Sequence, residues 1–141
     1  MKTIEYIKDI EIIVVGNGSK RVWLEEKLLD LNNIYFYSPV VYSDLSDLLC
    51  SADLHILFQK NDVIDTVMPS KILAMMSSKR PSIITGNLKS EVASIMEISK
   101  AGKYFEPGNI DEVIDFVKLL KKDKPLRQEY GKNAREFVSS K

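Results

Sequence analysis

The sequence predicts an α/β fold in which a parallel sheet of about four to five strands is flanked by helices. Short β-branched runs alternate with helical patterns along the whole chain, which is typical of repeated β-α units. The strand-like runs are almost entirely apolar, as expected of strands that helices cover on both faces. A length of 141 residues allows one domain and does not support two. We therefore expect a single domain over residues 1–141.

The first part of the chain predicts two β-α units. A strand over residues 11–15 ends at the glycine-containing turn 16–18, and Ser19 can then cap a helix. A second strand over residues 34–37 stops at a Ser-Pro pair, because proline cannot donate to the sheet ladder. A short helix over residues 45–49 follows.

The middle of the chain contains the third and fourth predicted strands. The third covers residues 54–58 and is followed by a loop over residues 59–68, and loops of this length are often functional. Pro69 suits the first turn of the next helix, which must end before Pro81. The fourth strand covers residues 82–85.

The remaining elements are a helix over residues 91–98, a fifth strand at residues 104–105 and two terminal helices. Asn109 and Glu112 have the spacing of a capping box at the start of the first terminal helix. The last helix is predicted over residues 125–139, with a proline in its first turn.

Composition excludes several classes of protein. The chain has 20 basic and 20 acidic residues and 45% apolar residues, so it has neither a nucleic-acid footprint nor a disordered composition. Cys50 is the lone cysteine and can form no disulfide within the chain, which favours a reducing compartment. Charged residues interrupt the N-terminus, and no apolar run approaches the about 20 residues of a membrane span. We expect a cytoplasmic protein.

Gly16-Asn17-Gly18 lies between a strand and a helix, where glycine lets the backbone approach an anion closely. It is half of a dinucleotide-binding fingerprint, because Arg21 occupies the position of the third glycine. An NAD site is therefore disfavoured. An ordinary tight turn remains the alternative interpretation.

Pro69-Ser70-Lys71 predicts a stronger anion site. A helix that starts at Pro69 leaves the N–H groups of Ser70 and Lys71 without partners in the helix. The Ser70 hydroxyl and the Lys71 ammonium add two donors, so the segment can hold a diphosphate. The alternative is an ordinary helix start with a solvated lysine.

No group of residues predicts a self-contained active site. His55 lies in an apolar strand and is interpreted as structural, and Cys50 is interpreted as a small buried side chain. No serine has an evident His/Asp partner, and no His/Cys cluster has metal-ligand spacing. We therefore predict no catalytic residue and no metal site from the residues alone.

Five segments, taken in order from Ile12 to Phe137, resemble the C-terminal, donor-binding domain of a GT-B glycosyltransferase of family 4, of the capsular or colanic-acid polysaccharide type. They are Val14-Val15-Gly16-Asn17-Gly18; residues 39–53; residues 67–73 with 78–83; Pro107-Gly108-Asn109; and Gly131-Lys132-Asn133-Ala134-Arg135.

The resemblance implies a Rossmann-like three-layer sandwich that binds a UDP- or GDP-linked sugar, retains anomeric configuration and needs neither a metal nor another cofactor. The implied diphosphate contacts are Gly16, Asn17, Gly18, Pro69, Ser70 and Lys71. The implied base contacts, through backbone groups, are Tyr37, Pro39, Val40 and Val41. The implied sugar contacts are Gly86, Asn87, Ser90 and Glu91.

The sequence departs from the family at a glutamate pair that many members carry, because Thr66 and Ala74 stand at the aligned positions. Asp65 or Asp62 is a candidate to replace one of these glutamates at the donor sugar.

Family enzymes are also much longer and contain an N-terminal, acceptor-binding domain. We therefore expect this chain to be a partial C-terminal half that is inactive alone, in an enzyme that works at the inner face of the cell membrane. The partners implied are the nucleotide-sugar donor and the missing domain. The alternative is a non-catalytic nucleotide-binding or interaction module, since fold does not fix function.

Overall fold

The computed structural model describes residues 10–15, 21–27, 33–59 and 70–140. The chain divides into two compact units, one ending at Leu45 and one beginning at Ser46, and each is described by itself.

The first unit contains one parallel strand pair. β1 (Ile12–Val15) pairs with β2 (Ile34–Tyr37) in a register that joins Ile12 to Ile34 and Val15 to Tyr37. The helix α1 (Arg21–Lys27) lies between them in sequence, and the 3₁₀ turn η2 (Tyr42–Asp44) follows.

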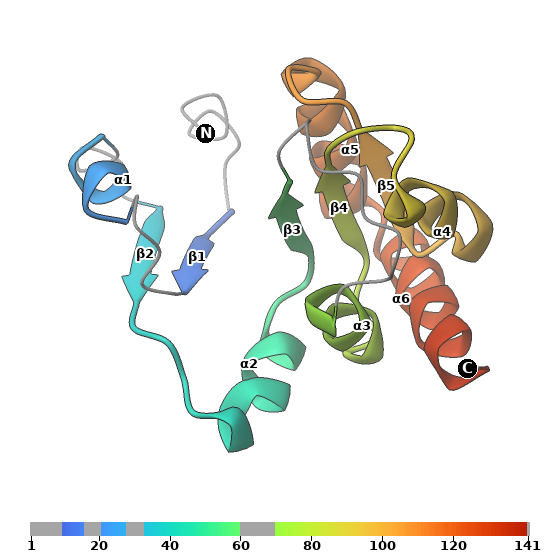
Figure 1. Ribbon diagram of the computed structural model, residues 1–141, viewed down its shortest axis with the longest axis horizontal. Coiled ribbons are helices and arrows are strands. Elements are labelled where there is room, and N and C mark those ends of the chain that lie inside the picture. Colours follow the sequence, from blue (N-terminus) through green and yellow to red (C-terminus); the bar gives the residue numbers. More distant parts are fainter. Residues whose placement is uncertain (1–9, 16–20, 28–32, 60–69, 141) are drawn as a thin grey trace. The chain divides into compact units, whose positions relative to one another are not determined.

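The second unit contains a three-stranded parallel sheet of order β3-β4-β5 (Figure 1). Its elements are α2 (Leu45–Ser51, which begins at the boundary), β3 (His55–Phe58), α3 (Ser70–Ser77), β4 (Ser82–Thr85), α4 (Glu91–Ser99), β5 (Gly102–Phe105), α5 (Ile110–Lys122) and α6 (Lys124–Ser139). The predicted α/β class and its parallel strands are confirmed. In the described residues the five strands form two sheets rather than the one that we expected.

Helices cover both faces of the three-stranded sheet. Side chains alternate between the faces of a strand, and Leu57, Ile84 and Tyr104 share one register row. Ile84 lies fully buried in a cluster with side chains of α3, α4 and α6, and Leu57 and Tyr104 pack against this cluster. Phe105, the next residue along β5, instead contacts Phe116 of α5. The second unit therefore has three layers, with α5 on one face and α3, α4 and α6 on the other.

The segment Gly131 to Arg135, singled out above as a family motif, fixes α6 to its neighbours. Gly131 lies against the Lys79 carbonyl group, close enough that any side chain would collide with it. Asn133 Nδ2 donates to the Lys100 carbonyl (3.1 Å), and Arg135 donates to the last carbonyl of α3 (3.1 Å). Lys79 and Lys100 both have left-handed backbones (φ 61° and 54°), as at helix C-termini. The motif thus holds the ends of α3 and α4.

Three local predictions need correction. Asn109 precedes α5 but makes no capping hydrogen bond, since its backbone (φ −81°, ψ 54°) is not in the extended conformation that directs a cap toward the helix. The last helix begins at Lys124, and its cap is Asp123, whose side chain accepts from the Leu126 amide (3.0 Å). The fifth strand starts at Gly102, two residues earlier than expected.

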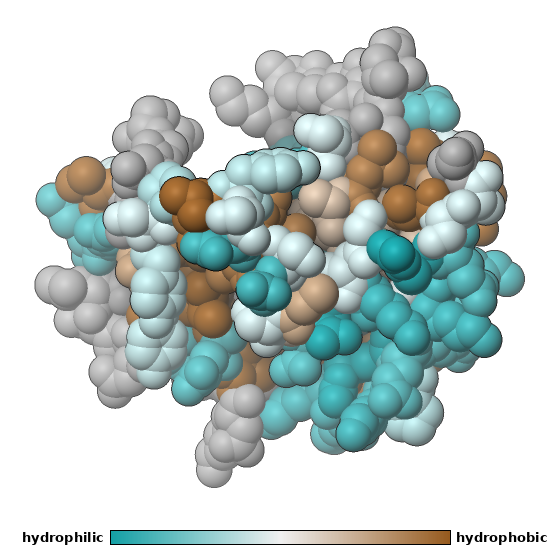
Figure 2. All heavy atoms as spheres, turned by 90° about the horizontal axis from the view of Figure 1, so that it is seen from below, coloured by the Kyte–Doolittle hydropathy of each residue, from teal (hydrophilic) through white to brown (hydrophobic). Residues whose placement is uncertain are grey.

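The helices α5 and α6 carry many exposed charged side chains. Figure 2 shows hydrophilic residues gathered over a large part of the face that it draws. Within the part of the chain that the structure describes, no helix has the length and apolar character needed to cross a bilayer.

Candidate functional site

The carboxyl edge of the β3-β4-β5 sheet is the candidate site, because ligands of open parallel sheets bind outside the carboxyl ends of the strands. Two contacts fix the directions of the helices. The end of α3 reaches the start of β3, where His55 Nε2 lies 2.9 Å from Ser78 Oγ. The cap of α4 reaches β5, where Ser90 Oγ lies 3.0 Å from the Tyr104 hydroxyl. Because α3 ends at the amino edge and α4 is capped beside the end of β5, both helices run back from the carboxyl edge of the sheet.

The predicted diphosphate site is described in part. Ser70 and Lys71 form the first turn of α3 and are exposed, so the hydroxyl, the ammonium and the first amides of the helix are accessible to an anion. The other residues predicted here, Gly16, Asn17, Gly18 and Pro69, lie outside the described residues, as does Asp65. Their roles stay predictions.

The predicted base site belongs to the first unit. Tyr37 ends β2, and Pro39, Val40 and Val41 follow as an exposed segment. The Val41 carbonyl accepts from the Asp44 amide (2.9 Å) and so closes the turn η2. Any backbone contact to a base from this segment would have to use the other amide and carbonyl groups.

The predicted sugar site is a compact turn between β4 and α4. Asn87 accepts twice, through its carbonyl from the Ser90 amide (3.0 Å) and through Oδ1 from the Lys89 amide (2.9 Å). Ser90 then caps α4 by accepting from the Ala93 amide (3.2 Å). Glu91 is exposed in the first turn of α4. The described residues predicted for sugar contact, Gly86, Asn87, Ser90 and Glu91, therefore lie together between β4 and the first turn of α4.

Two residues at this edge, Tyr104 and Gln59, were missed by sequence reasoning. Tyr104 lies 3.0 Å from Ser90 and donates to Gln59 Oε1 (3.3 Å), which ties the residue after β3 to β5 and to the start of α4. Gly86 lies beneath them and donates its amide to the Phe105 carbonyl (3.0 Å). The sequence signal that could have revealed Tyr104 was a tyrosine in a strand that was expected to be buried, because a buried tyrosine hydroxyl needs a hydrogen-bond partner.

The residues at the amino edge of the sheet, opposite the candidate site, have structural roles. Burial lowers the pKa of His55, and the Arg80 guanidinium lowers it further. Arg80 itself donates to the carbonyls of Ala52 (2.7 Å) and Cys50 (2.9 Å) and thus holds the end of α2. Cys50 was expected to be buried and is exposed, because α2 is a short helix without a buried residue.

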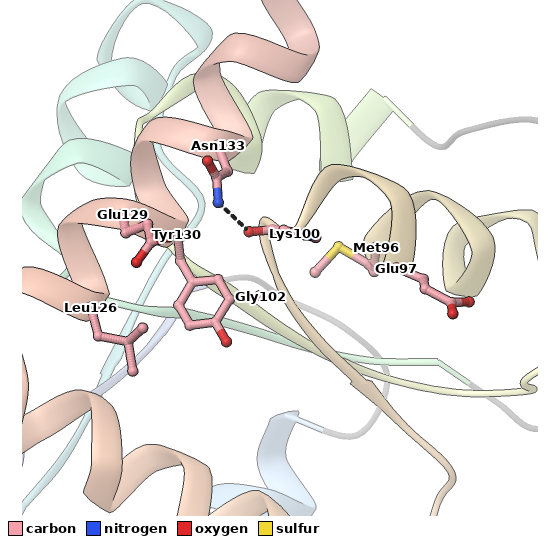
Figure 3. A pocket seen from close by; sticks show the side chains of 8 residues that line it. All are labelled: Met96, Glu97, Lys100, Gly102, Leu126, Glu129, Tyr130 and Asn133. Atoms are coloured by element: carbon pink, nitrogen blue, oxygen red, sulfur yellow. Dashed lines mark hydrogen bonds between the residues drawn. The ribbon is translucent and has the colours of Figure 1, made fainter.

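A cavity of about 220 Å³ also lies near the amino edge, between the end of α4, the start of β5 and α6 (Figure 3). Its lining residues include Glu97 of α4, Lys100, which follows α4, and Glu129 and Tyr130 of α6. Asn133 donates to the Lys100 carbonyl. It is smaller than the roughly 300–1,000 Å³ of small-molecule sites, and it adjoins the end of α4 rather than the starts of α3 and α4. It is therefore a packing gap rather than the candidate site. Among the described residues, no three His, Cys, Asp or Glu side chains gather as metal ligands.

A parallel sheet with helices that run back from its carboxyl edge defines the class of Rossmann-like α/β folds. The chain belongs to the family described as glycosyl transferases group 1, which it matches over residues 1–123. The family resemblance seen in the motifs is thereby confirmed.

Two relatives illustrate the match. Escherichia coli (strain K12) WcaI, named as a colanic acid biosynthesis glycosyl transferase, is 26% identical over 124 residues, which are 84% of this chain and 30% of the relative. The crystal structure of WaaG, a glycosyltransferase involved in lipopolysaccharide biosynthesis, shares the fold with a TM-score of 0.71 and 22% identity, over 93% of this chain and 34% of WaaG. The chain spans about a third of the length of each.

Proposed function

We propose that this chain is the donor-binding part of a retaining glycosyltransferase that moves a sugar from a UDP- or GDP-linked donor to a growing surface polysaccharide, capsule included. The observation that carries the proposal is the carboxyl edge, where α3 begins with the exposed donors Ser70 and Lys71. Family membership supports glycosyl transfer. The relatives named for colanic acid and lipopolysaccharide biosynthesis support a surface polysaccharide as the product.

The proposed chemistry is electrostatic. As the glycosidic bond breaks, negative charge develops on the departing nucleoside diphosphate. The first amides of α3, the Ser70 hydroxyl and the Lys71 ammonium would stabilise this charge without a metal ion. No side chain of this chain is assigned a proton-transfer or nucleophilic role.

The remaining donor contacts follow the sequence predictions. We assign the base to backbone groups from Tyr37 to Val41 and the sugar to the turn that contains Asn87 and Glu91. The acceptor-binding site and a second Rossmann-like domain would come from the longer protein, since the chain spans about a third of the length of its relatives. We propose that this longer enzyme works in the cytoplasm, peripherally at the inner face of the membrane, where nucleotide sugars and the growing polymer meet.

Titration calorimetry of the 141-residue chain with UDP, GDP, UDP-glucose, GDP-mannose and NAD tests the proposal. We expect a nucleoside diphosphate to bind and Lys71→Ala to weaken its binding about tenfold or more, because hydrogen bonds to charged groups contribute about 1.5–3 kcal/mol. Lys118→Ala is the matched control, since it removes the same charge from an exposed position on α5. That control should change the affinity less than about twofold.

Two results would contradict the proposal. Binding of NAD alone, or of no nucleotide by the folded chain, favours a non-catalytic module instead. Equal losses in Lys71→Ala and Lys118→Ala would mean that net charge, rather than the start of α3, attracts the diphosphate. We also expect negligible sugar transfer by the chain alone, measured as release of nucleoside diphosphate in the presence of acceptor.

A further inference from the structure

Tyr104 stands at a junction of three segments at the carboxyl edge. Its ring is half-buried and packs against the core cluster of α3, α4 and α6. Its hydroxyl contacts Gln59, which directly follows β3, and Ser90, which caps α4. The tyrosine therefore joins the ends of two strands that are not neighbours in the sheet to the start of a helix.

The direction of these hydrogen bonds follows from the available protons. The Tyr104 hydroxyl donates its single proton to Gln59 Oε1. The Ser90 hydroxyl must then donate to the Tyr104 oxygen, while the Ser90 oxygen accepts from the Ala93 amide. The Ser90 hydroxyl is thus held from both sides, as donor to Tyr104 and as acceptor from the Ala93 amide at the start of α4.

The turn between β4 and α4 is shaped around this hydroxyl. A Cβ atom at Gly86 would collide with the Tyr104 oxygen and would lie 3.1 Å from Gln59 Cβ, so the close approach requires glycine. Asn87 and Ser90 are then fixed by the hydrogen bonds of the turn. A displacement of Tyr104 would consequently shift the residues on either side of Ser90.

We propose that Tyr104 is a positioning residue for donor recognition: through Ser90 and Gln59 it holds the turn that contacts the donor sugar. This inference rests on the proposed function and adds to it a group that does not itself contact the sugar. A sugar is recognised by polar groups held in a fixed geometry, so an untethered turn would lose affinity for the sugar while the start of α3 keeps the diphosphate.

Tyr104→Phe is the test, because it keeps the ring in the core and removes only the hydroxyl. The quantity measured is the sugar contribution, the ratio of the Kd of the nucleoside diphosphate to the Kd of the corresponding nucleotide sugar, by calorimetry with UDP and UDP-glucose and with GDP and GDP-mannose. We expect this ratio to fall about five- to tenfold in the variant, with less than a twofold change in the Kd of the diphosphate alone.

Tyr130→Phe is the matched control, since it removes a hydroxyl from a half-buried tyrosine near the opposite edge of the sheet. It should leave both constants unchanged. Hydrogen exchange of the free proteins supplies a second readout. The Ala93 amide should exchange faster in Tyr104→Phe than in the unsubstituted chain and in Tyr130→Phe.

The outcomes separate the two proposals. An unchanged sugar contribution in Tyr104→Phe, or no sugar contribution in the unsubstituted chain, would overturn the inference while diphosphate binding upholds the proposed function. Equal losses for diphosphate and nucleotide sugar would assign Tyr104 a general structural role and would also overturn it. Absence of diphosphate binding by the unsubstituted chain would refute the proposed function and this inference with it.

Discussion

Substitution of Gly131 by alanine should destabilise the second unit, although alanine is the better helix former. Gly131 is buried in α6, where the helix passes over the turn between α3 and β4. An added Cβ atom would lie 2.9 Å from the Lys79 carbonyl carbon and closer still to its oxygen. Lys79 has a left-handed backbone and donates its amide to the carbonyl of Met76 (3.2 Å), so the turn has little freedom to move aside.

The magnitude follows from two opposed terms. Replacing glycine by alanine inside a helix stabilises by about 1 kcal/mol. Forcing a methyl group into a packed contact costs about 1–3 kcal/mol, and here the upper part of that range applies because the obstacle is backbone. We expect a net loss of about 1–2 kcal/mol in the free energy of unfolding, which corresponds to a fall in Tm of about 3–10 °C.

Urea unfolding followed by circular dichroism measures this loss. Gln128→Ala is the control, since Gln128 is exposed on the same helix and its replacement should change the stability by less than about 0.5 kcal/mol. A Gly131→Ala chain that is as stable as the unsubstituted chain, or more stable, would refute the close approach of α6 to Lys79.

Two further predictions concern charge and capping. The lowered pKa of His55, caused first by burial and then by Arg80, means that the unfolded chain binds more protons between the folded-state pKa and the ordinary value of 6.5. The free energy of unfolding should therefore fall as the pH drops through 6.5 and below. His55→Gln should flatten this dependence, measured by urea unfolding at several pH values. An identical pH profile in the variant would contradict the role of His55. Asp123→Ala removes the cap on the Leu126 amide and should lower the stability by about 1 kcal/mol in thermal unfolding, whereas Asp123→Asn should lose less; equal losses in both variants would argue against the cap.

The sequence predicted the order of the elements because helices and strands have different apolar periods. The strands over residues 12–15, 34–37, 55–58 and 82–85 were all expected, and the ends of most helices agree to within a few residues. The misjudged cap at Asn109 depended on backbone angles that residue spacing does not determine. The exposure of Cys50 depended on what packs around α2, which a local pattern cannot show.

Some residues of the candidate site were predicted from the sequence and others were not. The turn containing Asn87 and Ser90 was expected at a strand end, and its hydrogen bonds make it a compact unit. Tyr104 and Gln59 were missed because they are 45 residues apart and meet only where β3 and β5 end at one edge.

By itself the sequence determined the α/β class, the parallel strands and the family, because strand composition, turn residues and ordered motifs are local properties of the chain. The tertiary structure decided which groups meet. In the tertiary structure the segment from Gly131 to Arg135 contacts the ends of α3 and α4, and the Tyr104 hydroxyl lies next to Ser90. Long-range hydrogen bonds and close backbone approaches leave no periodic pattern in the sequence, since they depend on the relative positions of elements that fold far apart in the chain.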